Sequence, residues 1–412
     1  MARTLDVYLD HHLTGHLTQD DSGEMSFEYA QSWLNYGTAV PLSQSLPLRK
    51  ERFSRKECAG FFGGILPEAD QRKMVAKNLG ISERNDFAML ERIGGECAGA
   101  VTFMPSGQPL PDREDRYRNL TAKELADVVK SLPRRPLLAG EEGVRLSLAG
   151  AQDKVAVKVS DDTISIPLGG APSTHILKPE NPNFGDLVFN ESLCLDLARA
   201  VGLLVPKAEI RSADGLNFLL VERYDRSASD ESSGHYDRLH QEDFCQALGI
   251  VSDRKYQSEG GPSLEQCFGL LREVSTTPVI DLQRLLDAVI FNYLIGNNDA
   301  HGKNFSIVYN LPAAEAKLAP LYDLVCTVHY PDLSNTMAMK IGGEYLAEKV
   351  SPRHFEKLAE EADLAKPLVK RRVLELATAV IESLGKIDAK GAPDIATTIE
   401  KRSRAALDRF VG

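Results

Sequence analysis

The stretch Asn297-Asn298-Asp299-Ala300-His301-Gly302-Lys303-Asn304-Phe305 decides how the rest of this chain is interpreted. It is followed by Leu321-Tyr322-Asp323-Leu324, in which Asp323 stands 19 positions after Asn304. Carboxylate and amide oxygens are ligands that Mg²⁺ accepts, and a carboxylate can also take a proton from a hydroxyl group. Asp299, Asn304 and Asp323 therefore predict a site for phosphoryl transfer.

The order of these residues is the one that protein kinases use, with a catalytic base first and two metal ligands after it. On this pattern Asp299 accepts the hydroxyl proton, while Asn304 and Asp323 hold the metal. A polar turn after a buried helix would also be rich in Asn, Asp and Gly, so the 299–304 segment alone leaves both interpretations open. The placement of Asp323 after a strand-like segment favours the kinase interpretation.

Three further segments could hold a nucleotide. Lys178 ends a short apolar strand, from which it could reach phosphates, although an exposed edge-strand lysine is the alternative. The turn Ala149-Gly150-Ala151-Gln152 consists largely of small residues, which let backbone N–H groups approach phosphate oxygens. The strand end Glu222-Arg223-Tyr224 could meet an adenine edge with its backbone, with Tyr224 beside the ring, but a plain buried strand end fits equally well.

Composition excludes collagen-like, disordered and membrane proteins. The chain has 412 residues, 43% of them hydrophobic and 26% charged, which is typical of globular proteins with two or more domains. Its formal charge of −11 argues against a chain that coats nucleic acid unaided. The basic runs at 49–56 and 370–372 are more typical of solvated faces.

Cysteine usage and apolar runs bear on location. The six cysteines are scattered singly, without a CxxC pair, and are expected to be buried reduced thiols. The chain shows neither a secretory apolar region at its start nor an apolar run of 18 residues. We therefore expect a cytoplasmic protein that does not act at a membrane.

The distribution of periodic segments predicts an α+β fold with three parts. Residues 1–108 are expected to form a small α+β module that ends at a Pro/Gly-rich linker near 105–115, residues 109–240 a nucleotide-binding lobe, and residues 241–412 a mainly helical catalytic lobe. Segments expected to be strands are 5–9, 25–29, 144–148, 155–159, 175–178, 207–211 and 218–223. Segments expected to be helices are 54–62, 66–79, 121–131, 187–201, 282–295, 367–384 and 395–410.

Taken in order, five motifs resemble the HipA family of serine/threonine kinase toxins from bacterial toxin–antitoxin systems. They are Ser147-Leu148-Ala149-Gly150-Ala151-Gln152-Asp153-Lys154, Thr174-His175-Ile176-Leu177-Lys178-Pro179, Val221-Glu222-Arg223-Tyr224-Asp225-Arg226, Asn298 to Phe305, and Tyr322-Asp323. The segment Phe62-Gly63-Gly64-Ile65-Leu66-Pro67-Glu68 also resembles part of the family's N-terminal module, so the resemblance covers nearly the whole chain.

The resemblance implies a bilobal protein-kinase-like fold that uses ATP and Mg²⁺. It makes Asp299 the catalytic base and Asn304 and Asp323 the magnesium ligands. The residues that it places around ATP are Ala149, Gly150, Ala151, Gln152, Asp153 and Lys154 in a phosphate-covering loop, Lys178 at the phosphates, Glu222, Arg223 and Tyr224 in the adenine hinge, and His301, Gly302, Lys303, Asn304, Tyr322 and Asp323. It makes Ser147 a site of autophosphorylation, whose added charge would repel ATP and switch the enzyme off.

The same resemblance implies partners and a biological role. A small HipB-like helix-turn-helix antitoxin is expected, with operator DNA contacted mainly through it. The expected protein substrate is an aminoacyl-tRNA synthetase, such as glutamyl-tRNA synthetase, whose phosphorylation would arrest growth. Two alternatives remain: a small-molecule or lipid kinase, since the Asp-x-His-x-x-Asn order also resembles that of phosphoinositide kinases, and a non-catalytic ATP-binding corepressor, against which the presence of Asp299 argues.

Overall fold

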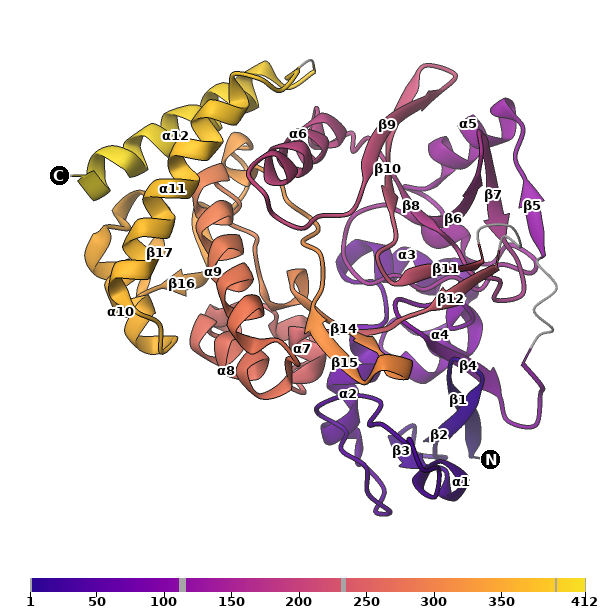
Figure 1. The fold of residues 1–412 in the computed structure, drawn as a ribbon. Helices are drawn as coiled ribbons and strands as arrows, with labels where there is room; N and C mark the ends of the chain where they lie inside the picture. The colour runs from indigo at the N-terminus through magenta and orange to yellow at the C-terminus, as the bar shows by residue number, and fades with distance from the viewer. Residues whose placement is uncertain (1, 111–115, 231–234, 390, 412) are drawn as a thin grey trace. The chain divides into compact units, whose positions relative to one another are not determined.

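The computed structural model describes residues 2–110, 116–230, 235–389 and 391–411 (Figure 1). The chain forms two compact units that do not follow the order of the sequence. The first contains residues 1–179, 211–253 and 308–314, and the second contains residues 180–210, 254–307 and 315–412. The predicted N-terminal module and most of the predicted nucleotide-binding lobe thus fall within one unit, and the boundary between them stays a prediction. The predicted linker lies partly outside the described residues.

The first unit begins with a four-stranded antiparallel sheet of order β3-β2-β1-β4. Its strands are β1 (Arg3–Leu9), β2 (His12–Gln19), β3 (Met25–Tyr29) and β4 (Val101–Pro105). Its helices are α1 (Gln31–Leu34), α2 (Arg55–Gly64), α3 (Ala69–Leu79) and α4 (Asp86–Ile93). The start of α2 is set by a capping box in which the side chain of Glu57 accepts the backbone N–H of Ser54 at 2.8 Å.

A second sheet in this unit has the order β5-β7-β6-β8-β10-β9. Its strands are β5 (Tyr117–Asn119), β6 (Val155–Ser160), β7 (Thr163–Pro167), β8 (His175–Pro179), β9 (Ala208–Ala213) and β10 (Leu216–Glu222). Helix α5 (Ala122–Ser131) has a strongly amphipathic sequence and begins at a capping box of Thr121 and Glu124. Strands β6, β7, β8 and β10 contain buried apolar residues, which join one continuous core with the first sheet.

The predicted strand at 144–148 is wrong. This segment is extended, but its pairing is an isolated bridge of Leu146 with Glu96, and Gly150, two residues after the segment, forms another with Pro67. Its backbone pairs with the N-terminal module, since Ser147 N–H donates to the carbonyl of Glu96 at 2.9 Å. The alternation of apolar residues was a correct sign of extended backbone. The partner of that backbone is distant in sequence and left no local signal.

The remaining strands of the first unit are β11 (Arg226–Asp230), β12 (His235–Arg238) and β13 (His240–Asp243), with α7 (Phe244–Ala247) and the end of β14 (Ser306–Asn310). Here a fully buried carboxylate, Glu242, accepts hydrogen bonds from Ser43 Oγ, Gln44 N–H and Tyr309 Oη at 2.5, 3.1 and 2.6 Å. Burial raises the pKa of Glu242 to about 7, despite these donors. Beside it, burial lowers the pKa of His240 to about 4.

The second unit is mainly helical and is built around α9 (Pro278–Ile295), in which every residue from Leu285 to Ile295 is buried. Its other helices are α6 (Leu187–Ala200), α8 (Leu264–Val274), α10 (Pro352–Glu361), α11 (Lys366–Leu384) and α12 (Pro393–Val411), and its strands are β15 (Glu315–Leu318), β16 (Thr336–Ile341) and β17 (Glu344–Leu346). Helices α8, α11 and α12 contact α9 (Figure 1). Arg372 on α11 fixes one of these contacts by pairing with the buried Asp287 of α9 at 2.8 Å.

The state of the cysteines is as predicted from the sequence, and the surroundings of the basic runs can be compared with their prediction. All six cysteines are buried free thiols. The run at 49–56 forms ion pairs at the surface, as in Arg49–Glu57 and Arg52–Glu28. In the run at 370–372, Lys370 and Arg371 are exposed, but Arg372 is half-buried against Asp287. Across the described ranges, none of the helices has the length and apolarity to span a bilayer. Within the same ranges, His, Cys, Asp and Glu form no group of three or more that could hold a metal.

Candidate active site

The segment that contains the predicted catalytic base begins where α9 ends. Gly296 stops the helix with φ of +77°, and its N–H donates to the carbonyl of Asn292. A Cβ atom at this position would lie 2.5 Å from Cγ2 of Val328 and 2.8 Å from Nε of Arg402. Glycine is therefore needed both for the left-handed backbone and for the close packing. The conformation of Gly296 therefore sets the direction in which the chain from Asn297 onward leaves the helix.

Asn297 connects the two acidic segments of the predicted site. Its side chain is buried; the amide nitrogen donates to the backbone carbonyl of Asp323 at 3.2 Å and to Asn292 Oδ1 at 2.9 Å. Its amide oxygen accepts the backbone N–H of Asp299 at 3.2 Å. One side chain thus joins the backbones of Asp299 and Asp323, which are 24 positions apart in the sequence. The structure brings these two predicted residues together.

Asn304 is tied to the same loop. Its amide nitrogen donates to the backbone carbonyl of Asp299 at 3.2 Å, and its backbone N–H donates to the carbonyl of His301 at 2.9 Å. With its nitrogen held by the loop, the amide presents its oxygen as the group that can ligate a metal. Asp323 is half-buried and has φ of +52°, an uncommon conformation for a non-glycine residue that re-aims its side chain. A carboxylate and an amide oxygen are hard ligands, and they fit Mg²⁺.

Tyr322 secures the segment that carries Asp323. Its hydroxyl donates to the backbone carbonyl of Lys303 at 2.7 Å and accepts from Ser306 Oγ at 2.6 Å. The side chains of His301 and Lys303 are both buried, and Gly302 lies with Lys303 and Asn304 in a single 3-10 turn. The predicted residues His301, Gly302 and Lys303 are therefore the buried part of the loop.

Asp299 itself is the exposed residue of this group. Its carboxylate accepts a hydrogen bond from the hydroxyl of Tyr256 at 2.7 Å. The ring of Tyr256 packs edge-on against that of His301, with centroids 5.4 Å apart and an interplanar angle of 82°. An exposed carboxylate near the two candidate metal ligands, Asn304 and Asp323, is suited to accept a proton from a substrate hydroxyl.

The predicted phosphate-covering loop lies in the first unit and is held there. Gly150, with φ of +105°, bridges to Pro67, and its carbonyl accepts the N–H of Glu68 at 3.1 Å. Lys154 donates from Nζ to the carbonyl of Ala149 at 2.9 Å. The side chain of Asp153 is hydrogen-bonded to Gln71, and burial raises its pKa. Gln152 is half-buried and Ala151 is exposed.

Ser147 is completely buried at the start of this loop. Its hydroxyl donates to the backbone carbonyl of Ile65 at 3.0 Å. Lys178, also buried, stands in β8 opposite Leu219 of β10. Neither side chain is an exposed surface group, so the alternative of a solvated edge-strand lysine is excluded for Lys178.

The predicted hinge contains two different environments. Glu222 is exposed at the end of β10, and the half-buried Tyr224 is hydrogen-bonded through its hydroxyl to Gln241. Arg223, by contrast, is buried and its guanidinium is used within the protein: it donates to both oxygens of Asp225 at 2.9 and 2.7 Å and to Glu96 Oε1 at 3.2 Å. Its side chain anchors the predicted hinge, and its backbone N–H donates to the carbonyl of Thr174 at 2.8 Å.

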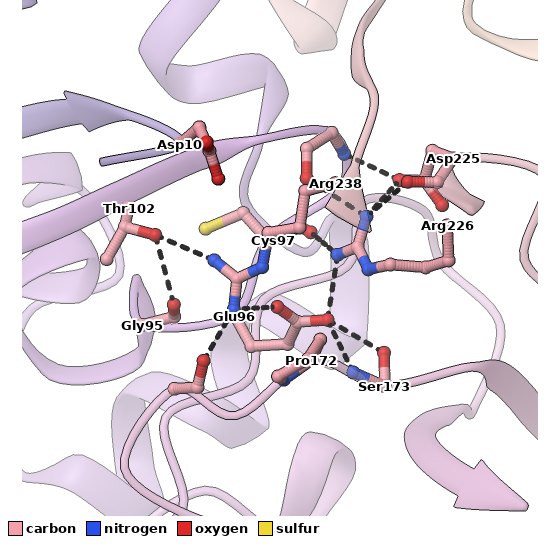
Figure 2. Close-up of polar contacts among 12 residues, drawn as sticks. Asp10, Gly95, Glu96, Cys97, Thr102, Pro172, Ser173, Asp225, Arg226 and Arg238 are labelled. Atoms are coloured by element: carbon pink, nitrogen blue, oxygen red, sulfur yellow. Dashed lines mark hydrogen bonds and ion pairs between the residues drawn. The ribbon is translucent and has the colours of Figure 1, made fainter. Parts of the chain in front are cut away.

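Figure 2 shows the ion cluster around Glu96, whose side chain is fully buried. Glu96 Oε1 accepts from Arg226 at 2.7 Å and from Ser173 N–H and Oγ at 2.9 and 2.8 Å, while Oε2 pairs with Arg238 at 2.6 Å. Burial alone would raise the pKa of Glu96, but the surrounding arginines hold it below its ordinary value. The cluster joins the segments at 96–99, 173, 223–226 and 238.

Comparison with known proteins places these observations in one family. Residues 146–384 match the family model of the HipA-like C-terminal domain, and residues 5–104 match that of the HipA N-terminal domain. The chain belongs to the HipA family. A putative kinase, Y4mE, from Sinorhizobium fredii is 47% identical over 94% of this chain and 92% of its own length.

A second HipA relative has a more specific name. The serine/threonine-protein kinase toxin HipA of Shewanella oneidensis is 29% identical over 99% of this chain and 96% of its own length. A solved structure of the toxin–antitoxin system HipA, HipB and its operator DNA complex from the same species matches with a TM-score of 0.83 and 28% identity. It covers 99% of this chain and 96% of the solved chain. The mixed fold is thus protein-kinase-like, and this HipA family member is a protein serine/threonine kinase.

Two residues that contact the predicted site residues were given no role in the sequence prediction. Asn297 was quoted within the motif but given no role, and Tyr256 lies 43 positions before Asp299. An asparagine that directly follows the glycine cap of a buried helix was a usable signal, since such a position is often a structured turn. For Tyr256 the sequence offered no signal, because its contact depends on the path of a loop.

Proposed function

We propose that this HipA protein transfers the γ-phosphoryl group of ATP, with Mg²⁺, to a serine of a cytoplasmic protein and thereby arrests growth. The single observation that carries the proposal is the junction at Asn297, whose one amide binds the backbones of Asp299 and Asp323. Phosphoryl transfer needs positioned groups more than covalent chemistry. Asn297 thus fixes the position of the proposed proton acceptor, Asp299, relative to the proposed metal ligand, Asp323.

Within this proposal Asp299 accepts the proton of the acceptor hydroxyl. Asn304, through its amide oxygen, and Asp323, through its carboxylate, would hold magnesium. The ion, when bound, neutralises charge on the phosphates. Support for the assignment comes from the donor set and from the hydrogen bond that leaves the oxygen of Asn304 available. Tyr322 and Lys303 keep the two ligand segments in register.

The nucleotide is assigned to the remaining predicted residues. Lys178 contacts its phosphates, the loop from Ala149 to Lys154 covers them, and Glu222 to Tyr224 meet the adenine. The consecutive small residues of the loop and the positive φ of Gly150 support this assignment, because they let backbone N–H groups approach phosphate oxygens. Lys154 is positioned within the loop by its bond to Ala149.

Self-inactivation through Ser147 is part of the proposal. A phosphate on this residue would add about −1.5 to −2 charges to a site that is now fully buried and hydrogen-bonded to Ile65. The modified residue would not fit in its present place. The segment from Ser147 to Lys154 would then leave its position beside Pro67 and no longer cover ATP phosphates.

The proposed partners follow from the relatives. The solved HipA structure is a complex with HipB and operator DNA. For this chain we propose a HipB-like helix-turn-helix antitoxin that carries most of the DNA contact, which suits the formal charge of −11. The proposed substrate is an aminoacyl-tRNA synthetase, with glutamyl-tRNA synthetase first among them.

The experiment is a phosphoproteomic comparison of cells that express the chain without its antitoxin and cells that express the Asp299→Asn variant. We expect growth arrest and a new phosphoserine on a synthetase with the unaltered chain only. Normal growth at confirmed expression would remove the toxin role. Phosphate on lipids or small molecules in place of proteins would replace the proposed substrate class.

Ser147 is tested separately by intact-mass measurement of the purified full chain after incubation with ATP and Mg²⁺. We expect a gain of one phosphate, which the Ser147→Ala variant does not show although it still binds ATP. Unchanged phosphate incorporation in that variant would contradict the proposed switch.

A further inference from the structure

We propose that Tyr256 is a positioning residue for the catalytic carboxylate of Asp299. The inference rests on the proposed function, since it requires Asp299 to be the group that accepts the substrate proton. It adds a residue outside the kinase motifs, from the loop before α8. Both residues belong to the second unit.

The contact is a direct hydrogen bond in which Tyr256 Oη donates to Asp299 Oδ1 at 2.7 Å. Asp299 is exposed, and an exposed aspartate samples several rotamers unless a partner holds it. The hydroxyl of Tyr256 selects one rotamer. It occupies one carboxylate oxygen and leaves the other, Oδ2, to accept the proton of a substrate serine.

Tyr256 can hold the carboxylate because its own backbone is held. Its carbonyl accepts the N–H groups of Glu259 at 2.9 Å and Gly261 at 2.8 Å, which closes a tight turn. Gly261 is packed so closely that a Cβ atom there would lie 2.5 Å from the carbonyl oxygen of Arg254. The next residue, Gln257, is fixed to β16, where its side-chain oxygen accepts the N–H of Lys340 at 2.9 Å.

The ring of Tyr256 is also held in place. It packs edge-on against the buried imidazole of His301, which belongs to the same loop as Asp299. A tyrosine anchored through its backbone, its neighbour and its ring is not a group that swings away to admit substrate. The geometry therefore favours a fixed support for the base over a gate that covers it.

The test compares phosphoryl transfer by the full-length wild type and Tyr256→Phe, which removes only the hydroxyl. With [γ-³²P]ATP and Mg²⁺ at a fixed protein concentration, we expect the maximal rate of Ser147 phosphorylation to fall about tenfold, as for a lost hydrogen bond to a charged group. The ATP concentration that gives half-maximal rate should stay within about twofold, because a positioning residue of the base acts on turnover and not on nucleotide binding.

Tyr345→Phe is the matched control, since it removes a hydroxyl from β17 of the same unit and should leave the rate unchanged. Asp299→Asn separates this inference from the proposed function. If Asp299→Asn keeps the wild-type rate, the proposed function fails and the role of Tyr256 with it. If Asp299→Asn abolishes transfer while Tyr256→Phe is as fast as the wild type or faster, only the inference on Tyr256 is overturned.

Two further measurements distinguish a positioning role of Tyr256 from a structural role and from a role as phosphate acceptor. The thermal unfolding midpoint of Tyr256→Phe should match that of the wild type, so that the loss of rate is not a loss of fold. Phosphate found on Tyr256 by mass spectrometry of the Ser147→Ala variant would overturn the inference, because the hydroxyl would then be an acceptor in the place of substrate.

Discussion

Two groups of acidic residues in this protein are used in opposite ways. In the first unit, Glu96 and Asp225 are buried, and each is paired with two or more arginines. In the second unit, Asp299 is exposed and Asp323 is half-buried on a backbone of positive φ. The first group is surrounded by three arginines, Arg223, Arg226 and Arg238. The second is the one that the kinase motif identifies.

The difference teaches that charge density alone does not mark an active site. Burying a carboxylate is costly unless its oxygens are paired, and both oxygens of Glu96 lie against guanidinium groups, Oε1 at 2.7 Å from Arg226 and Oε2 at 2.6 Å from Arg238. A catalytic carboxylate must keep an oxygen available, and the support here comes from neutral groups. Tyr256 donates to the carboxylate of Asp299, while Asn297 accepts the backbone N–H of Asp299 and donates to the backbone carbonyl of Asp323. The Glu96 cluster serves the hinge indirectly, because it fixes the side chain of Arg223.

The largest effect on stability is expected for Glu96→Gln. The change removes the buried carboxylate that pairs with Arg238 and leaves Arg223 and Arg226 to share Asp225, which should lower the free energy of unfolding by about 3–5 kcal/mol. Urea unfolding curves give this value. Glu91→Gln is the matched control: it removes a carboxylate that forms an exposed pair with Arg3 and should cost less than about 1 kcal/mol. Equal losses in the two variants would break the contrast between buried and exposed pairs.

A smaller effect, on both stability and turnover, is expected for Asn297→Ala. The variant leaves the N–H of Asp299 and the carbonyl of Asp323 without their partner, at a cost of about 1–3 kcal/mol. Phosphoryl transfer should also fall about tenfold, since the two catalytic segments lose their common support. Calorimetry and a radiolabel assay on the same preparation measure both. A loss of stability with full activity would show that Asn297 supports the fold alone.

The smallest effect is a pH dependence of stability at Glu242 and His240. The raised pKa of Glu242, about 7, means that the folded state binds more protons than the unfolded state, so its contribution to stability falls as pH rises from about 4.5 to 7. The lowered pKa of His240, about 4, has the opposite sign: its contribution is lost as pH falls below about 6.5. In the wild type these slopes oppose each other.

Substitution should separate the two contributions. Relative to the wild type, Glu242→Gln should gain stability with rising pH between 5 and 6.5, and His240→Gln should lose it, each by up to about 1.4 kcal/mol per pH unit. Unfolding free energies at several pH values measure the slopes. Parallel curves for the three proteins would contradict the assignment, and phosphoryl transfer should not follow these slopes.

Much of the fold could be predicted from sequence because its elements carry their own signals. Helix α9 is long and apolar, and it ends at Gly296. The N-termini of α2 and α5 are marked in the sequence by capping boxes. The segment 144–148 could not be assigned in the same way, because its partner, the segment around Glu96, lies about 50 residues earlier. Its extended form follows from a tertiary contact, which overrides local propensity.

The residues of the candidate site also differ in whether a local sequence signal or only a tertiary contact identifies them. Asp299, Asn304 and Asp323 could be proposed from the sequence because kinase chemistry fixes their type and order, and their segments are joined by hydrogen bonds in the structure. Arg223 could not be placed correctly by motif alone, since the same residue can meet a ligand or a buried carboxylate, and only burial decides. Tyr256 could not be found at all, because nothing near it in sequence indicates that its loop returns to the base.

The most direct measurement is transfer of ³²P from [γ-³²P]ATP to protein by the full chain and by Asp299→Asn, with binding of a fluorescent ATP analogue measured in parallel. We predict that the variant loses at least about 100-fold in the rate of transfer and keeps its nucleotide affinity. Transfer at the wild-type rate by Asp299→Asn would contradict the assignment of this carboxylate as the catalytic base, and with it the contrast between the two acidic regions.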